Sequence, residues 1–176
     1  MNKLLPLAFL LVPLSAHSES FMGLTIEPEN RCTPYSRQDG YSSYNANALR
    51  DQLIEQQGLY SPYSGKFFPL EEWTGKSYQR YTPDLEHIVG ASEAHESGLC
   101  SSPIETREAF SSDLLNLTLA EARTNRDFKV AKDAADWLPE VNQCWYVNRV
   151  IQVKLKYSLS IDLREKQALQ AVLQSC

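Results

Sequence analysis

The C-terminal stretch constrains the fold most strongly, because it predicts two helices that must pack against each other. Apolar residues recur at helical spacing in residues 143–157 and again in residues 162–175. At about 1.5 Å per residue each helix is roughly 20 Å long. The link at residues 158–161 is short, which favours an antiparallel hairpin. Asp162 and Glu165 fit a capping box at the start of the second helix.

The positions of the cysteines predict how this hairpin is cross-linked. Of the four cysteines, Cys144 lies at the start of the first helix and Cys176 directly after the second. An antiparallel hairpin therefore brings these two together, and we predict the disulfide Cys144–Cys176. By elimination, Cys32 and Cys100 form the other disulfide. No C-x-x-C pair is present, which disfavours a zinc site.

The first 18 residues have the pattern of a secretory signal peptide. Lys3 precedes an apolar run at residues 4–14, and small residues follow at 15–18. The run is too short to span a bilayer, so we expect no stable membrane association. The pattern predicts a secreted or periplasmic protein of bacterial export, in a compartment where disulfides persist.

The remaining part, about 158 residues, fits one domain with a workable core. The formal net charge of the chain is -5, which argues against tight nonspecific binding of duplex nucleic acid through a basic surface. A metal ion and a local group of basic residues would offset this charge. We expect an N-terminal arm and helix at 19–75 that packs on a core at 76–176.

The pattern of the chain predicts a single α+β domain, in which a small two-stranded element is embedded in a mostly helical, loop-rich chain. We expect strands at residues 85–89 and 114–119. Asn45 and Gly58 are typical caps for a helix at residues 46–57. Further helical segments are expected at residues 91–96, 103–110, 125–132 and 133–138.

Residues 84–89 combine two carboxylates and an imidazole on the first predicted strand. Side chains alternate along a strand, so Asp84 and Glu86 point to one face and His87 to the other. His87 is the candidate general base for phosphodiester hydrolysis, because imidazole is partly deprotonated near neutral pH. Glu86 and Asn125 offer metal-ligating oxygens, and Asp84 is a further candidate ligand or a strand cap. Oxygen ligands favour Mg²⁺ first, then Mn²⁺ or Ca²⁺, over Zn²⁺.

Other residues have candidate supporting roles at this site. Asn116 is expected to hold the loop that carries His87. Lys129 lies one helical turn after Asn125, on the same face, and is a candidate contact for substrate phosphate. Arg126 is a further candidate, although it is equally an ordinary solvated charge.

Two residues are candidates for orienting the metal ligands through hydrogen bonds, without contacting the metal themselves. His95 and Asp113 are both close in sequence to the predicted strands. Side chains behind a metal site commonly hold its ligands by hydrogen bonds. For His95, a structural role or such a supporting role is favoured over direct catalysis.

The order of three short motifs resembles that of the His-Asn-His (HNH, ββα-metal) endonucleases, in particular their exported bacterial branch. The motifs lie at residues 84–89, 113–117 and 125–129, and further similar runs lie at 92–95, 97–100, 133–139 and 144–146. The resemblance covers roughly residues 29–176. It implies a ββα-metal element, made of two short strands and a helix.

The resemblance also implies roles for single residues. His87 matches the general base, Glu86 and Asn125 match metal ligands, and Asn116 matches the asparagine that orients the base loop. Three positions depart from the usual pattern: Glu86 replaces Asp, Asn125 replaces His, and Gly90 replaces Pro.

These features together predict a secreted metal-dependent endonuclease that acts on DNA, RNA or both and needs no obligate protein partner. The alternative is a noncatalytic cell-envelope binding module with a degenerate HNH site. That module would use the aromatic-rich stretch at residues 60–81 to bind its ligand. In a nuclease the same rings would stack on single-stranded bases or pack over the core, and we favour core packing. A glycosidase with Glu86 as the acid is disfavoured, because it lacks a suitably placed second carboxylate.

Overall fold

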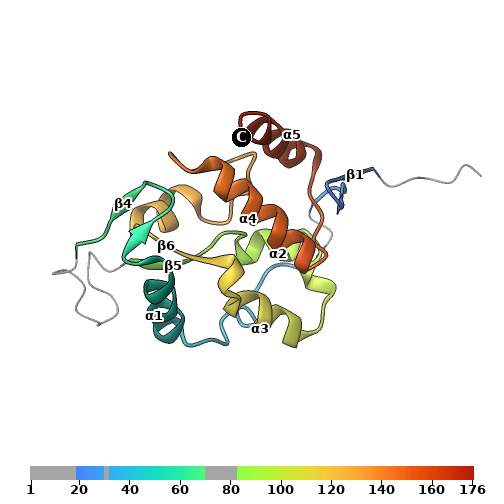
Figure 1. The fold of residues 1–176 in the computed structure, drawn as a ribbon. Coiled ribbons are helices and arrows are strands. Elements are labelled where there is room, and N and C mark those ends of the chain that lie inside the picture. Colours follow the sequence, from blue (N-terminus) through green and yellow to red (C-terminus); the bar gives the residue numbers. More distant parts are fainter. Residues whose placement is uncertain (1–18, 30–31, 70–82) are drawn as a thin grey trace, which may run out of the picture.

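The computed structural model describes residues 19–29, 32–69 and 83–176 (Figure 1). The predicted signal peptide at residues 1–18 lies outside these ranges. So does the end of the aromatic-rich stretch, from residue 70 to residue 82.

In the described ranges, three small antiparallel sheets contain two strands each. β1 (Ser20–Phe21) pairs with β2 (Leu24–Thr25), β3 (Tyr60–Ser61) with β4 (Lys66–Phe67), and β5 (Asp84–His87) with β6 (Leu117–Ala120). In the β5–β6 pair, Glu86 lies opposite Thr118 and His87 opposite Leu117. This pair is the element on which the candidate site is built.

The rest of the described chain is mainly helical. The α-helices are α1 (Ala46–Gln57), α2 (Ala91–Glu96), α3 (Ile104–Ser112), α4 (Gln143–Lys156) and α5 (Leu163–Leu173). The shorter elements are the 3-10 turns η2 (Leu99–Ser101) and η3 (Leu114–Asn116), and η4 (Thr124–Lys129), which is a π-helix. The predicted α+β domain with two disulfides is confirmed.

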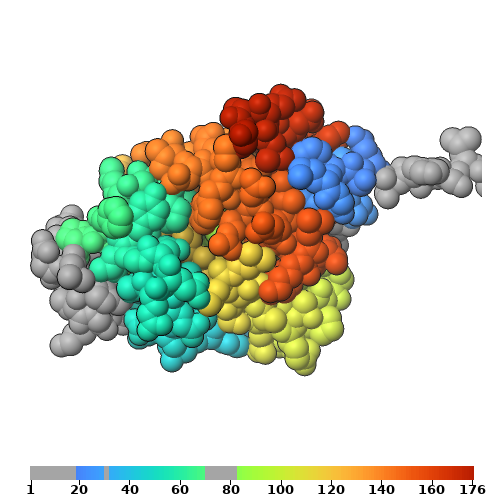
Figure 2. All heavy atoms as spheres, in the orientation of Figure 1, coloured from blue at the N-terminus to red at the C-terminus, as the bar shows by residue number. Residues whose placement is uncertain are grey.

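α4 crosses the middle of the face seen in Figures 1 and 2, and α5 packs against it. The face of α4 that carries Tyr146, Val147 and Val150 is at most 2% exposed, and Leu169 of α5 is fully buried. On the other side of the β5–β6 pair, Leu53 of α1 packs in a smaller apolar cluster with the side chains of β6. The β5–β6 pair is therefore held between α1 and the main core.

Both predicted disulfides are confirmed. Cys144 and Cys176 are joined with a Cα–Cα distance of 5.8 Å, and Cys32 and Cys100 with one of 6.0 Å. The first closes the helical hairpin of α4 and α5, and the second fastens the N-terminal arm to η2.

The helix caps follow the sequence with one exception. The side chain of Asn45 accepts the N–H of Ala48, and Gly58 ends α1 with a φ of 73°. Asp162 caps α5 by accepting the N–H of Glu165 at 2.7 Å. The reciprocal half of the capping box is not made, because the Glu165 carboxylate binds Lys154 instead.

Three predicted elements are wrong in type or extent. The first strand ends at His87 and not at residue 89. The second strand begins at Leu117 and not at residue 114, because residues 114–116 form a 3-10 turn that Asp113 caps. Residues 133–138 form turns and not a helix. There Asp133 accepts the N–H groups of Ala135 and Asp136, as an N-cap does, but Pro139 prevents the single turn from continuing as a helix.

Candidate functional site

His87 ends β5 and is oriented by groups from α3. Its Nε2 lies 2.9 Å from the carbonyl oxygen of Ser111, and its ring stacks on Phe110 and meets Tyr44 edge-on. A carbonyl oxygen only accepts hydrogen bonds, so Nε2 carries the proton and Nδ1 keeps a lone pair. Burial lowers the pKa of His87 to about 4, against the opposing effect of the Ser111 bond. His87 is therefore a neutral imidazole with one fixed tautomer.

Asn116 clamps the turn that follows His87. Its side chain is fully buried, accepts the N–H of Val89 at 2.8 Å and donates to the carbonyl of Val89 at 3.2 Å. Its own carbonyl accepts the N–H of Ile88 at 2.8 Å. These three bonds tie the end of β5 to the start of β6. This is the position from which an asparagine can hold the loop after the base.

Glu86 and Lys129 form a buried ion pair on the opposite face of β5. Glu86 is 4% exposed and Lys129 is fully buried, with 2.9 Å between Lys129 Nζ and Glu86 Oε1. Lys129 also donates to the main-chain oxygen of His87 at 2.9 Å. Burial raises the pKa of Glu86, although Lys129 opposes the shift. Because its ammonium is buried against Glu86, Lys129 does not present a contact for substrate phosphate as the sequence led us to expect.

Asp84 forms hydrogen bonds with Asn125 and Arg126, the two other residues expected at the site. Asn125 donates from Nδ2 to Asp84 Oδ2 at 3.0 Å, which leaves the amide oxygen of Asn125 out of this bond. Arg126 binds both oxygens of Asp84, at 2.7 and 2.8 Å, and its side chain is 60% exposed. Arg126 thus places a cation at the solvent edge of the site.

The structure therefore sorts the predicted site residues into two groups. Asp84 and Glu86 lie along one face of β5 and are each joined to a residue of η4. The ring of His87 belongs to the other group and contacts α3. The strand alternation predicted from the sequence accounts for this division.

His95 has a structural role at the N-terminal arm. It is 1% exposed, with Nδ1 3.0 Å from the hydroxyl of Tyr41 and Nε2 2.7 Å from the carbonyl oxygen of Thr33. Both ring nitrogens are thus engaged, and the ring holds the arm against α2.

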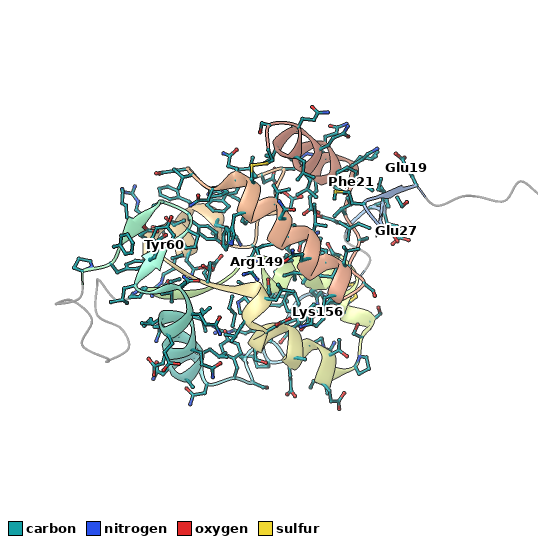
Figure 3. All side chains as sticks on the ribbon, in the orientation of Figure 1. Glu19, Phe21, Glu27, Tyr60, Arg149 and Lys156 are labelled. Atoms are coloured by element: carbon teal, nitrogen blue, oxygen red, sulfur yellow. A yellow bond between two sulfur atoms is a disulfide. The ribbon has the colours of Figure 1, made fainter. Side chains whose placement is uncertain are left out.

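Asp113 supports the site through η3. It accepts the N–H of Leu115 at 3.1 Å, the ammonium of Lys156 at 2.6 Å and the hydroxyl of Tyr157 at 2.9 Å. Burial acts to raise the pKa of Asp113, but these bonds outweigh it and lower the pKa. Figure 3 shows Lys156 and Arg149 reaching from α4 toward this segment, where Arg149 approaches the carbonyl of Leu115 at 3.4 Å. Asp113 thereby anchors the turn that carries Asn116.

In the part of the chain that the structure describes, two groups of three His, Cys, Asp or Glu side chains are close enough to share a metal ion. The first consists of His95 with Cys32 and Cys100, whose sulfurs are consumed by the disulfide. The second is Glu29, Asp133 and Asp162. Neither group includes a predicted ligand on β5.

The sequence did not reveal the groups that contact His87 and Glu86. The Ser111 carbonyl is a main-chain group, and main-chain acceptors leave no signal in the residue type. The residues beside Lys129 gave no signal of its burial, because the flanking Phe128 and Val130 are exposed.

The aromatic-rich stretch is divided between core and surface in its described part. Tyr63 is 1% exposed and packs edge-on against Trp137 and Tyr146, as expected for core packing. Phe67 is 77% exposed and lies beside Tyr60, with 5.1 Å between the ring centroids.

Comparison with known proteins places this architecture in a family. Among the described residues, no helix is both long and apolar enough to cross a membrane. The chain is 28% identical over 182 residues to an "uncharacterized secreted protein" of the fungus Arthroderma benhamiae, covering 94% of this chain and 87% of that protein. No solved structure matches. The family model of GmrSD restriction endonucleases, C-terminal domain, matches residues 28–172, and the chain therefore belongs to this family.

Proposed function

We propose that this protein is a secreted, metal-dependent nuclease that hydrolyses phosphodiester bonds in DNA or RNA with His87 as the general base. The family is named for endonucleases, and the fungal relative is described as secreted. The two disulfides fit an exported protein. The fungal relative gives no support for restricting the proposal to bacteria.

The state of His87 is the observation that carries the proposal. A general base must be unprotonated at working pH and must hold its lone pair in a fixed direction. The bond from Nε2–H to Ser111 meets the second condition, and burial meets the first by lowering the pKa of His87 to about 4. Nδ1 is then the atom that takes a proton from the attacking water.

The opposite face of β5 has the donor chemistry for a hard divalent cation. Asp84 and Glu86 offer carboxylate oxygens, and Asn125 offers an amide oxygen that its bond to Asp84 leaves unused. Such oxygen ligands suit Mg²⁺, Mn²⁺ or Ca²⁺. A bound cation supplies stabilisation of the negative charge that develops on the phosphate.

The protein's own cations set the charge balance of this face. Arg126 and Lys129 neutralise Asp84 and Glu86 one for one. Arg126 is largely exposed, so its guanidinium is placed to meet a substrate phosphate at the edge of the site. Asn116 acts as a positioning residue, because it fixes the turn after His87.

A nuclease assay on plasmid DNA and on RNA, with EDTA or added Mg²⁺, Mn²⁺ or Ca²⁺, tests the proposal. We expect metal-dependent cleavage that His87→Ala lowers by about 10²–10⁴-fold, the usual contribution of a general base. Added imidazole should restore part of the activity of this variant. Phe67→Ala, at an exposed position, serves as the matched control and should cleave like the parent. Equal rates for His87→Ala and the parent would refute His87 as the base.

A noncatalytic cell-envelope module is the second candidate, and two observations favour it. Both carboxylates of the β5 face are already paired with cations, and Phe67 is strongly exposed beside Tyr60. This candidate predicts retention on peptidoglycan that Phe67→Ala weakens, together with no metal-dependent cleavage. The parent and Phe67→Ala, each tested for metal-dependent cleavage and for retention on peptidoglycan, therefore separate the two functions.

A further inference from the structure

The exposed side of η4 carries an aromatic ring flanked by two cations. Phe128 is 46% exposed, and the guanidinium carbon of Arg123 lies over its ring, 5.0 Å from the ring centroid. A cation in this position is attracted to the ring, which holds the two side chains together. Lys132 follows η4, is exposed, and donates to the main-chain oxygen of Phe128 at 2.7 Å. An exposed aromatic ring and two positive charges thus meet at one place on the surface.

The π-helical conformation of η4 brings Arg123 and Phe128 together. A π-helix bonds residues five apart, and here the N–H of Val130 donates to the carbonyl of Asn125 at 3.0 Å. Residues five apart, such as Arg123 and Phe128, therefore lie on the same side, whereas an α-helix aligns residues three or four apart. Val130 ends η4 with a φ of 51°, which is strained for a β-branched residue. Both features are concentrated at functional sites in proteins.

The same element also makes the contacts to β5. Arg126 of η4 binds Asp84, and Lys129 of η4 pairs with Glu86. Phe128 lies between Arg126 and Lys129 in the chain, so it belongs to the edge where Arg126 is placed to meet a substrate phosphate. A nucleic-acid strand that binds at Arg126 therefore has neighbouring nucleotides within reach of Phe128.

The charge of this surface is opposite to that of the chain as a whole. The formal net charge of the chain is -5, but residues 123–132 contain four cationic side chains and one carboxylate, Asp127. Arg126 shares its charge with Asp84. Within the described ranges, no carboxylate forms a salt bridge with Arg123 or Lys132. These two charges are therefore available to phosphates.

We propose that Phe128, with Arg123 against its ring, is a stacking platform for an unpaired base, and that Arg123 and Lys132 contact the phosphates beside it. Aromatic rings interleaved with cations bind single strands in this way, largely without regard to sequence. In a duplex, neighbouring bases cover each base face, so only the phosphate contacts remain. The inference rests on the proposed nuclease function and deepens it, because it names a single-stranded segment as the preferred substrate.

Binding in EDTA tests the platform without cleavage. Fluorescence anisotropy with a labelled oligothymidylate, and with a duplex of equal length, gives the two affinities. We expect the parent to bind the single strand at least tenfold more tightly than the duplex. Phe128→Ala should weaken single-strand binding by about tenfold, as loss of one base–aromatic stack does, and Phe128→Trp should retain it. Phe67→Ala removes an exposed phenylalanine outside η4 and is the matched control, which should bind like the parent.

The salt dependence of binding tests the phosphate contact. For single strands, the slope of log K against log salt changes by about 0.7 for each phosphate contact. Arg123→Gln should therefore reduce the magnitude of this slope by about 0.7, whereas Phe128→Ala should leave the slope unchanged. Lys66→Gln removes an exposed cation of β4 and is the control, whose slope should equal that of the parent.

Cleavage assays separate the failure of the platform from the failure of the nuclease proposal. With metal present, Phe128→Ala should raise KM for single-stranded DNA more than it lowers kcat. A parent that binds single strands through Phe128 but cleaves nothing would refute the nuclease and support the platform.

Three results would overturn the platform. The first is a parent that cleaves nucleic acid while Phe128→Ala binds and cleaves single strands equally well. The second is equal affinity of the parent for the single strand and the duplex. The third is a parent that binds phosphatidylserine vesicles through Phe128 but no oligonucleotide, because the ring and its cations would then serve a membrane surface.

Discussion

Lys129 and Lys154 are both fully buried, but their surroundings differ. Lys154 lies between two buried carboxylates, Glu93 and Glu165, at 2.6 Å each, and also donates to the carbonyl of Ser160 at 3.1 Å. Although burial opposes it, the two carboxylates raise the pKa of Lys154. Lys129 has one carboxylate partner, Glu86, at 2.9 Å.

The difference shows how the same residue type serves two purposes. Lys154 joins α2, α4 and α5, so its ion pairs hold three helices together. Lys129 donates to the main chain of His87 and neutralises a candidate metal ligand, so its contacts shape the candidate site. We expect loss of Lys154 to reduce stability alone and loss of Lys129 to reduce both stability and activity.

The largest expected effect is that of Lys154→Met. It leaves Glu93 and Glu165 buried without a countercharge, which should lower the free energy of unfolding by about 3–5 kcal/mol in urea titrations. Lys156→Met is the control, because the Lys156 side chain is 50% exposed in its pair with Asp113; it should cost less than about 1 kcal/mol. Similar losses in both variants would contradict the structural role of Lys154.

Lys129→Met should cost about 3 kcal/mol, because it leaves a single buried carboxylate unpaired. It should also lower nuclease activity per folded molecule, whereas Lys154→Met assayed well below its Tm should not. The double variant Glu86→Gln/Lys129→Met should regain part of the stability but none of the activity. Full activity in Lys129→Met would show that Lys129, like Lys154, contributes to stability alone.

The pH dependence of stability tests the state of His87. Its pKa is about 4 in the folded protein, against an ordinary value of 6.5. Between these values the unfolded chain binds more protons, so stability should fall as the pH falls from about 6.5 to about 4, by at most about 3 kcal/mol. In His87→Gln this part of the loss should vanish, as urea titrations at several pH values will show. A parallel pH profile in both proteins would mean that His87 is not held neutral.

Asn116→Ala should have the smallest effect on stability, about 2 kcal/mol, from two buried hydrogen bonds to the main chain of Val89. Because Asn116 is a positioning residue, its replacement should change kcat more than KM, with kcat lowered. Asn116→Asp keeps the acceptor for the Val89 N–H and loses the donor, so its kcat should lie between those of Asn116→Ala and the parent. An unchanged kcat in Asn116→Ala would remove Asn116 from the site.

Features set by local pattern could be predicted from the sequence. The helix Ala46–Gln57 and its caps, the C-terminal hairpin, both disulfides and the α+β class are all confirmed. Amphipathic periodicity and capping residues act within a few turns, so they are visible in the residue order. The helix expected at residues 133–138 does not form, because the turn that Asp133 caps is followed directly by Pro139.

The catalytic and metal-binding roles expected of these residues remain predictions, and the structure adds which groups contact each of them. The order of Glu86, His87, Asn116 and Asn125 in the sequence indicated the candidate base and metal ligands, and the strand period determined that Glu86 and His87 face opposite ways. Only the tertiary structure decided their partners: a carbonyl of α3 for His87 and the buried Lys129 for Glu86. Burial and charge pairing depend on segments far apart in the chain, so residue order alone does not reveal them. The close group of carboxylates formed by Glu29, Asp133 and Asp162 arises in the same way, because only folding brings these three segments together.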